Sequence, residues 1–221
     1  MTTLSNAPVA PLLARLFAEA EANPPAASPI FAGTTAEDHG RMMRSKTDYR
    51  EFYRLLGSFA LPVSRETGTL LYMLARATRA TSIVEFGTSF GLSTVHLAAA
   101  LRDNGGGRLI TTEFEPAKLA RAQAHLAEAG LADLVEFREG DALETLAHDL
   151  PEAIDLVLLD GAKGLYSDIL DRLEPHLRPG AILIADNADY CPEYLARVGE
   201  VENGYLSMPF TDEVEFSIRL G

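Results

Sequence analysis

From residue 82 onward, short apolar runs of strand type alternate with helical segments, and this alternation constrains the fold more than any other feature. Two of the runs, 153–160 and 181–186, are almost wholly apolar, which is typical of central parallel strands covered on both faces. Strands that alternate with helices form right-handed βαβ units in a doubly wound sheet. The expected strands are residues 82–86, 108–112, 134–138, 153–160, 181–186, 205–208 and 214–220.

Helical segments fill the intervals between these strands. Residues 116–129 carry apolar side chains at helical spacing, with Pro116 suited to the first turn and Gly130 to the C-terminal end. Further helices are expected over 92–101, 164–177 and 194–198. We therefore predict a Rossmann-like α/β fold, with a doubly wound, mostly parallel seven-stranded sheet and helices on both faces.

Residues 1–59 are predicted to form an N-terminal helical extension, and residues 60–221 the main domain. Two adjacent prolines in the stretch NPPAASP, residues 23–29, end a first amphipathic helix. Residues 35–58 are predicted to form a second helix, with Phe52, Leu55 and Leu56 on its buried face.

Charge and cysteine content exclude several classes of protein. The formal net charge of −13 disfavours nucleic acid and anionic membrane surfaces as partners, because both are bound by clustered Lys and Arg. Cys191 is the single cysteine, so no intramolecular disulfide can form and a Cys-rich zinc site is excluded. Neither a signal peptide nor a run of ~20 apolar residues is found. These features suit a cytoplasmic protein.

The residues that follow the first three strands indicate a nucleoside-bearing cofactor. Gly87 and Gly91 permit a tight strand-to-helix turn, and Glu113, about 20 residues further on, is placed to accept hydrogen bonds from ribose hydroxyls. Asp141 follows the third strand, where it can meet an adenine edge or simply cap the next helix. S-adenosylmethionine (SAM) fits better than NAD, because SAM has no pyrophosphate and the turn lacks the G-x-G-x-x-G pattern. Glu85 would also repel a phosphate.

The residues that follow the next two strands indicate a metal-assisted reaction. Asp160 ends the fourth strand and Asp186-Asn187 ends the fifth. Since these strands are neighbours in the usual order of this fold, their oxygens should lie close together and suit a hard cation such as Mg²⁺, Ca²⁺ or Mn²⁺. Lys163 follows Asp160 by three residues. A lysine beside a divalent cation is expected to have a lowered pKa and can act as a general base, although a solvent-facing lysine is the ordinary alternative.

From about residue 60 to 221, the chain resembles the metal-dependent small-molecule O-methyltransferases, the group that contains catechol and caffeoyl-CoA O-methyltransferases. Its most specific feature is an Asp followed by Lys three residues later, Tyr three after that, and then Asp-Asn at the end of the next strand. The stretches that carry the resemblance are ALPVSRETGTLL, VEFGTSFGLS, LITTEFEP, EGDA, LLDGAKGLY and ADNADYCPEYLARV.

The resemblance implies a SAM-dependent and divalent-metal-dependent O-methyltransferase of catechol-like, vicinal dihydroxy aromatic molecules, with Lys163 as the general base. Residues 60–221 would form the methyltransferase domain, and the extension would act as a lid and in homodimer contacts. The implied metal ligands are Asp160, Asp186 and Asn187. The implied cofactor contacts are Val63, Glu85, Gly87, Ser89, Ser93, Glu113, Phe114, Asp141, Ala142 and Asp160. The implied substrate contacts are Leu61, Lys163, Asn187 and Tyr190.

The chain departs from the animal catechol enzyme on the substrate side. Ala162 stands where that enzyme has an aromatic gatekeeper, and the chain has no tryptophan. Tyr190 is therefore the candidate aromatic wall of the substrate site, and the sequence does not specify the acceptor molecule. Two other functions are alternatives to the metal-dependent enzyme: a metal-independent methyltransferase of another acceptor, and a non-catalytic SAM-binding module. The acidic oxygen set and Lys163 favour the metal-dependent enzyme over both, and an NAD dehydrogenase ranks last.

Overall fold

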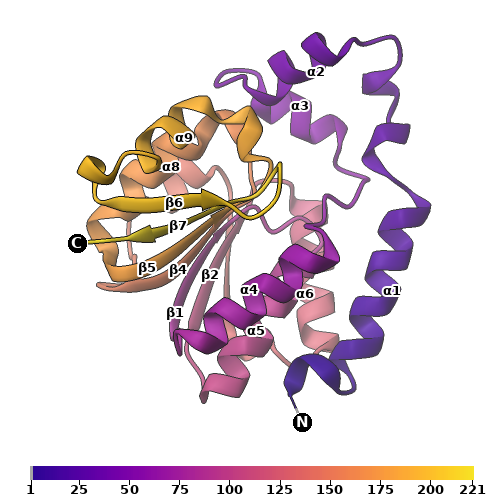
Figure 1. The fold of residues 1–221 in the computed structure, drawn as a ribbon. Helices are drawn as coiled ribbons and strands as arrows, with labels where there is room; N and C mark the ends of the chain where they lie inside the picture. The colour runs from indigo at the N-terminus through magenta and orange to yellow at the C-terminus, as the bar shows by residue number, and fades with distance from the viewer. Residues whose placement is uncertain (1) are drawn as a thin grey trace.

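The computed structural model describes residues 2–221, with the backbone alone described at residue 36. A seven-stranded sheet with the order β3-β2-β1-β4-β5-β7-β6 forms its centre (Figure 1). The first five strands pair in parallel, and β7 is antiparallel to both of its neighbours. The predicted doubly wound, mostly parallel sheet is therefore confirmed. The strands are β1 Ser82–Phe86, β2 Arg108–Glu113, β3 Val135–Glu139, β4 Ile154–Leu159, β5 Leu177–Ala185, β6 Tyr205–Pro209 and β7 Glu215–Arg219.

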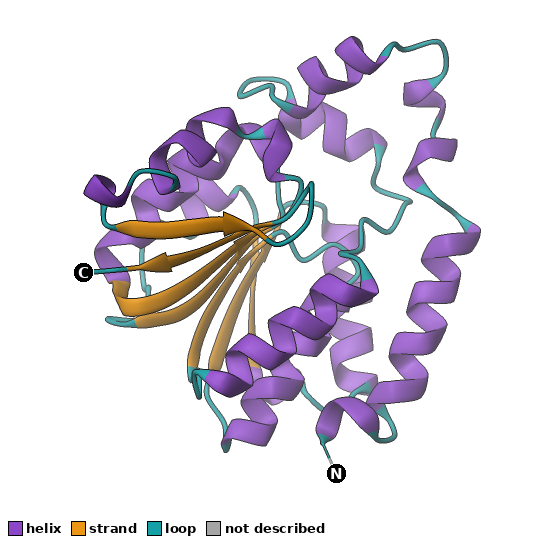
Figure 2. Ribbon diagram, in the orientation of Figure 1, coloured by secondary structure: helices purple, strands orange, loops and turns teal. Residues whose placement is uncertain are grey.

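Helices cover both faces of the sheet, as Figure 2 shows. One apolar cluster joins α1, α4, α5 and α6 to one face, and a second joins α8 and α9 to the other. The strand β4 contributes side chains to both clusters, which explains its almost unbroken apolar sequence. The helices are α1 Val9–Ala22, α2 Ala36–Met43, α3 Tyr49–Leu55, α4 Arg65–Ala77, α5 Leu92–Asn104, α6 Pro116–Glu128, α7 Ala142–Thr145, α8 Tyr166–Leu173 and α9 Pro192–Val198.

Backbone hydrogen bonds continue beyond the strand ends and hold the following residues at one edge of the sheet. The amide of Asp160 donates to the carbonyl of Phe86 at 2.8 Å, and that of Asp186 donates to the carbonyl of Leu159 at 2.9 Å. Because parallel strands present their carboxyl ends at one edge, these acidic residues follow neighbouring strands at the place where α/β folds bind ligands.

The N-terminal segment passes over this edge, but not as the single helix predicted for 35–58. The segment is divided into α2 and α3. Between them, the hydroxyl oxygen of Ser45 accepts from the amides of Thr47 at 3.3 Å and Asp48 at 2.9 Å. Such local side-chain bonds compete with helical hydrogen bonds, and this competition explains the break.

Two further predictions on helices were wrong in detail. Leu55 is 55% exposed, whereas Phe52 and Leu56 are buried as expected. The helix predicted over 164–177 ends at Leu173, ahead of a short 3-10 turn at Glu174–His176. A proline at position 175 cannot supply the amide that would continue the α-helix.

Gly87 makes the closest backbone approach at the edge of the sheet. Its φ is +102°, and an added Cβ would lie 2.6 Å from the carbonyl oxygen of Asp160. Gly105 has nearly the same φ, +101°, but nothing lies within 4 Å of an added Cβ. We therefore expect Gly105→Ala to cost ~1–2 kcal/mol of unfolding free energy from backbone strain, and Gly87→Ala ~3 kcal/mol or more because a clash is added. Urea unfolding of both variants measures the difference, and equal losses would show that the close approach is unimportant.

Candidate active site

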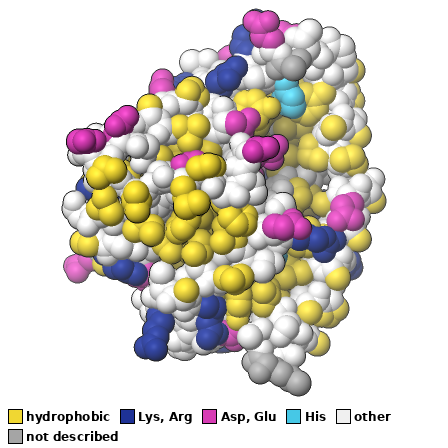
Figure 3. All heavy atoms as spheres, viewed as in Figure 1, with side chains coloured by type: hydrophobic (Ala, Val, Ile, Leu, Met, Phe, Trp, Pro, Cys, Tyr) yellow, Lys and Arg dark blue, Asp and Glu magenta, His cyan; other side chains and the backbone are white. Residues whose placement is uncertain are grey.

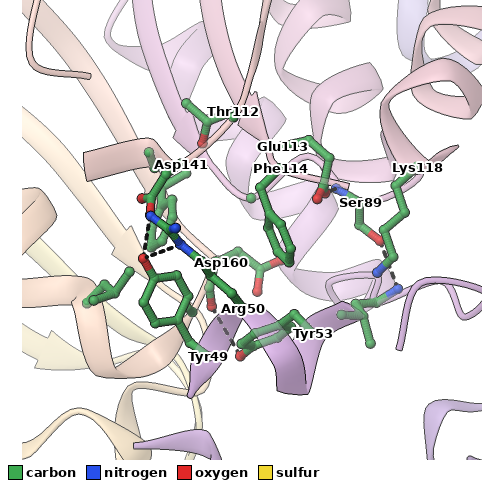
Figure 4. Close-up of a pocket in the computed structure, with 18 residues that line it drawn as sticks. Tyr49, Arg50, Tyr53, Ser89, Thr112, Glu113, Phe114, Lys118, Asp141 and Asp160 are labelled. Carbon is green, nitrogen blue, oxygen red and sulfur yellow. Dashed lines mark hydrogen bonds and ion pairs between the residues drawn. The ribbon is translucent and has the colours of Figure 1, made fainter. Parts of the chain in front are cut away.

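A pocket at the carboxyl edge, here called the inner pocket, is lined by the turns that follow the first four strands and by helix α3 (Figure 4). The turns bring backbone and side chains from four separate segments of sequence to one place, and α3 covers them. The residues that line it are Tyr49, Arg50, Tyr53, Leu61, Phe86, Gly87, Ser89, Thr112, Glu113, Phe114, Lys118, Gly140, Asp141, Ala142, Asp160, Gly161, Ala162 and Leu165.

Glu113 is held rigidly at the end of β2. Its two carboxylate oxygens accept hydrogen bonds from the amides of Ser89 at 2.9 Å and Glu115 at 3.0 Å. Burial raises the pKa of Glu113 above its ordinary value. The carboxylate faces the inner pocket in a fixed orientation, where its remaining lone pairs can accept hydroxyl hydrogens from a ligand.

Glu85 lies beneath the pocket and is fully buried. Its Oε2 accepts from the hydroxyls of Thr94 and Thr111, both at 2.6 Å, whereas Oε1 has no partner among the described residues. Burial raises the pKa of Glu85 to about 7. A buried carboxylate oxygen without a partner is costly to maintain, and it marks a place where a ligand or water can donate a hydrogen bond.

Asp141 both caps a helix and lines the inner pocket. Its Oδ1 accepts from the amide of Leu143 at 2.9 Å, which caps α7. Its Oδ2 accepts from the Tyr49 hydroxyl and from Nε of Arg50, the latter at 3.0 Å. Burial opposes ionisation, but these bonds outweigh it and lower the pKa of Asp141. The bonds also tie α3 to the loop after β3 (Figure 4).

A second and larger space, here called the outer cavity, lies between the N-terminal segment and the ends of β4 and β5. Its volume is about 630 Å³. Tyr53, Leu61 and Asp160 line both spaces, so the two meet there. The residues that line the outer cavity are Pro25, Ala26, Phe31, Thr34, Thr35, His39, Met43, Phe52, Tyr53, Leu56, Leu61, Pro62, Asp160, Lys163, Asp186 and Asn187.

Lys163 lies where the two spaces meet and is only 4% exposed. Its Nζ donates to Oδ1 of Asp160 at 2.8 Å and to the hydroxyl of Tyr166 at 2.9 Å. The Tyr166 hydroxyl in turn donates to the carbonyl of Asp186 at 2.7 Å. This network joins the loops after β4 and β5, and it fixes the position of the ammonium group.

The pKa of Lys163 reflects burial and the charges around it. Burial is the largest single effect and lowers this pKa, but Asp160 and the other neighbouring acidic groups together outweigh burial, and the pKa lies well above its ordinary value. The lowered pKa expected from the sequence applies to a lysine beside a divalent cation, and it stays a prediction for a cation bound at the Asp160 carboxylate. A base role for Lys163 requires a second cation to share that carboxylate.

Asp160, Asp186 and Asn187 all line the outer cavity and offer oxygen donors. Burial, followed by the neighbouring charge of Asp160, raises the pKa of Asp186 to about 7. Among the described residues, no group of three or more His, Cys, Asp or Glu is placed to hold a metal ion, and the third member of this set is an amide. Two crowded carboxylates and an amide oxygen nevertheless fit a hard divalent cation.

Comparison with known proteins finds methyltransferases that are similar to this chain. A family model described as a methyltransferase domain matches residues 84–188. A catechol O-methyltransferase of Niastella koreensis is 37% identical over 134 residues, which are 59% of this chain and 60% of that protein. Catechol O-methyltransferase B of Danio rerio is 33% identical over 72% of this chain and 62% of that protein. The matched region thus spans about 60% of the length of these curated relatives.

This chain is therefore similar to class I O-methyltransferases over its central region. Solved structures have a similar fold. The O-methyltransferase TomG of Streptomyces achromogenes, in complex with SAM, has a TM-score of 0.62 at 27% identity, over 88% of this chain and 96% of that chain. An O-methyltransferase of Bacillus cereus in complex with SAH shares the fold, with a TM-score of 0.64 at 22% identity, over 84% of this chain and 97% of that chain.

Most of the residues singled out from the sequence lie at the two spaces. Those that line the inner pocket are Leu61, Gly87, Ser89, Glu113, Phe114, Asp141, Ala142 and Asp160. Those that line the outer cavity are Leu61, Asp160, Lys163, Asp186 and Asn187.

Four predicted site residues lie elsewhere. Glu85 and Ser93 are buried behind the inner pocket. Val63 lines a separate groove that it shares with Asp186 and Asn187. Tyr190 lines a pocket behind Lys163 rather than the outer cavity, because the short turn Ala188–Tyr190 carries it past the edge of the sheet.

Sequence reasoning missed the residues that the N-terminal segment and α6 contribute. Tyr49, Arg50 and Tyr53 of α3 cover the inner pocket, and Lys118 of α6 lines it at 3% exposure. The three α3 residues are far in sequence from the strand ends, and the hydrogen bond between Arg50 and Asp141 spans 91 residues. No local sequence pattern could therefore place them at the pocket. An apolar stripe was the available signal for α3, and it did not identify which face meets the ligand.

No helix among the described residues combines the length and the apolar character needed to span a membrane.

Proposed function

We propose that this protein transfers the methyl group of SAM to one hydroxyl of a vicinal dihydroxy aromatic molecule, with the help of a divalent cation. The observation that carries the proposal is the junction of the inner pocket and the outer cavity at Asp160, beside the buried Lys163. A donor bound in one space and an acceptor bound in the other would meet at this junction. The catechol O-methyltransferases among the relatives, and the SAM complex of TomG, support the assignment.

The proposed cofactor site is the inner pocket. Glu113 would accept the ribose hydroxyls, and Asp141, Phe114 and Ala142 would surround the adenine. Glu85, with its unpartnered Oε1, would accept hydrogen bonds from the methionine end, directly or through water. With the adenine at Asp141 and the methionine end at Glu85, the sulfonium of SAM would lie toward Asp160 and the outer cavity.

The proposed metal site consists of Asp160, Asp186 and Asn187, whose oxygens fit Mg²⁺, with Ca²⁺ and Mn²⁺ as alternatives. When bound, a divalent cation supplies positive charge that lowers the pKa of a coordinated hydroxyl. The bound cation would share the Asp160 carboxylate with Lys163, which forms an ion pair with it.

Residues of the chain position the acceptor and move its proton. Tyr166 and Asp160 hold the Lys163 ammonium group at the junction, so its neutral form would accept the proton of the hydroxyl that is methylated. The enclosing side chains of α3 exclude water and hold the two reactants in line. The resulting phenolate oxygen would then attack the methyl carbon of SAM, and the electron pair of the broken C–S bond would stay on the sulfur of the product.

The proposal is tested by incubating the purified chain with labelled SAM, Mg²⁺ and pyrocatechol. Transfer of label to the diol is the expected result. SAM binding without transfer to any aromatic diol would reject the proposed reaction and favour a binding module or a different acceptor.

The proposal extends to the setting of the enzyme. Residues 60–221 would form the catalytic domain, and residues 2–59 would wall the acceptor site and help to form a homodimer; Met1 lies outside the described residues. The single buried cysteine suits the cytoplasm. A monomer mass measured by light scattering would reject the proposed homodimer.

Glu113→Gln is expected to weaken SAM binding by about ten- to a hundredfold, because charge-assisted hydrogen bonds to the ribose are lost. Glu115→Gln is the matched control, since this neighbouring side chain does not line the inner pocket. Isothermal titration with SAM measures both variants. Equal affinities for the two variants would remove Glu113 from the proposed ribose site.

A further inference from the structure

The outer cavity is much larger than one catechol ring. At about 630 Å³, it falls in the range of sites that enclose drug-sized ligands. A water-sized group occupies roughly 30 Å³, so the cavity has room for about twenty such groups. A benzene ring with two hydroxyls supplies fewer than half of them.

The wall opposite the strand ends is a continuous row of aromatic rings. The ring of His39 lies 4.4 Å from that of Phe31, the ring of Phe31 lies 6.1 Å from that of Phe52, and Phe52 and Tyr53 are 4.9 Å apart, all between centroids. Met43 and Leu56 add aliphatic surface. Figure 3 shows hydrophobic side chains in the hollow on this face, below α2. Flat, extended aromatic ligands pack well against such a surface.

The charges are confined to the end of the cavity where the two spaces meet. Among the described residues that line it, Lys163 is the single Lys or Arg, and its ammonium group is already paired with Asp160 at 2.8 Å. An anionic tail, such as a carboxylate or a coenzyme A phosphate, would meet no further Lys or Arg among the described residues of the aromatic wall. The net charge of −13 adds a long-range repulsion of anions.

We infer that the acceptor is an uncharged aromatic diol of two or three rings. Its hydroxyls lie at Asp160, Lys163 and Asp186, and its further rings stack along the wall from Tyr53 to His39. This inference rests on the proposed function, and it makes the N-terminal segment the part of the chain that selects the acceptor.

The inference is tested first with three diols: pyrocatechol, uncharged 2,3-dihydroxynaphthalene and anionic 3,4-dihydroxybenzoate. The expected result is a KM for the naphthalene diol about tenfold or more below that for pyrocatechol, with similar kcat, because the second ring is buried against the wall. The benzoate should have a KM no lower than that of pyrocatechol. A KM for the naphthalene diol equal to that of pyrocatechol, or a preference for the benzoate, would overturn the inference.

A matched pair of variants locates the second ring. Ala26 is exposed and lines the outer cavity, whereas its neighbour Ala27 is exposed and does not line it. Ala26→Phe should lower the ratio of kcat/KM for the two-ring diol over the one-ring diol about tenfold, whereas Ala27→Phe should leave this ratio as in the wild type. The same ratio in both variants would overturn the inference.

These outcomes separate the inference from the proposed function. Methylation of pyrocatechol without selectivity for the second ring rejects the acceptor class alone. No methylation of any diol by a chain that still binds SAM rejects the proposed reaction, and the acceptor class with it.

Discussion

Lys163→Ala is expected to lower kcat by about 10²–10⁴-fold, the usual contribution of a positioned general base. The affinity for SAM should change far less, since Lys163 does not line the inner pocket. Single-turnover methyl transfer, with SAM binding measured separately, resolves the two quantities.

The variant needs a control for folding, because removing one partner of a buried ion pair leaves the other charge uncompensated. Lys46→Ala is a suitable control: Lys46 is 44% exposed and pairs with Asp168 and Glu193 at the surface, where such pairs contribute ~0–1 kcal/mol. Unfolding of both variants should be measured with Mg²⁺ present, which can compensate the Asp160 carboxylate.

A base role also predicts behaviour that a purely structural role does not. The residual rate of Lys163→Ala should rise with pH, because hydroxide replaces the lost base, and small primary amines should restore part of it. Turnover within a few-fold of wild type, with no response to amines, would exclude Lys163 as the base.

The carboxyl edge of the sheet could be predicted from the sequence because it depends on local rules. Strand ends are marked by where apolar runs stop, and parallel strands bring those ends together. Asp160, Lys163 and Asp186 were therefore found from their positions alone, and the structure places them at one junction. That β4 and β5 are neighbours was expected from the strand order usual for this fold, and the sheet has this order.

The N-terminal segment could not be predicted in this way. Its pairing with the edge depends on contacts such as that between Arg50 and Asp141, which no local pattern specifies. The turn that separates α2 from α3 arises from hydrogen bonds of Ser45, a residue that helical propensity treats as nearly neutral.

Removal of divalent cations by EDTA is expected to abolish methyl transfer, and added Mg²⁺ should restore it. The rate of methyl transfer should fall by more than about 10³-fold, because the proposed cation contributes several kcal/mol of charge stabilisation in the transition state. SAM binding should survive chelation, since the inner pocket has its own polar groups in Glu113 and Asp141. Activity that does not change with EDTA would support methyl transfer but reject the proposed metal site.

Asp186→Ala should reproduce the effect of chelation, and direct binding of Mn²⁺, followed by electron paramagnetic resonance, tests the site without relying on turnover. Asp189→Ala is the matched control, because Asp189 is three residues away, exposed and outside the outer cavity. Loss of Mn²⁺ binding in the first variant alone would support the proposed ligand set. Retained Mn²⁺ binding would instead remove Asp186 from the proposed metal ligands.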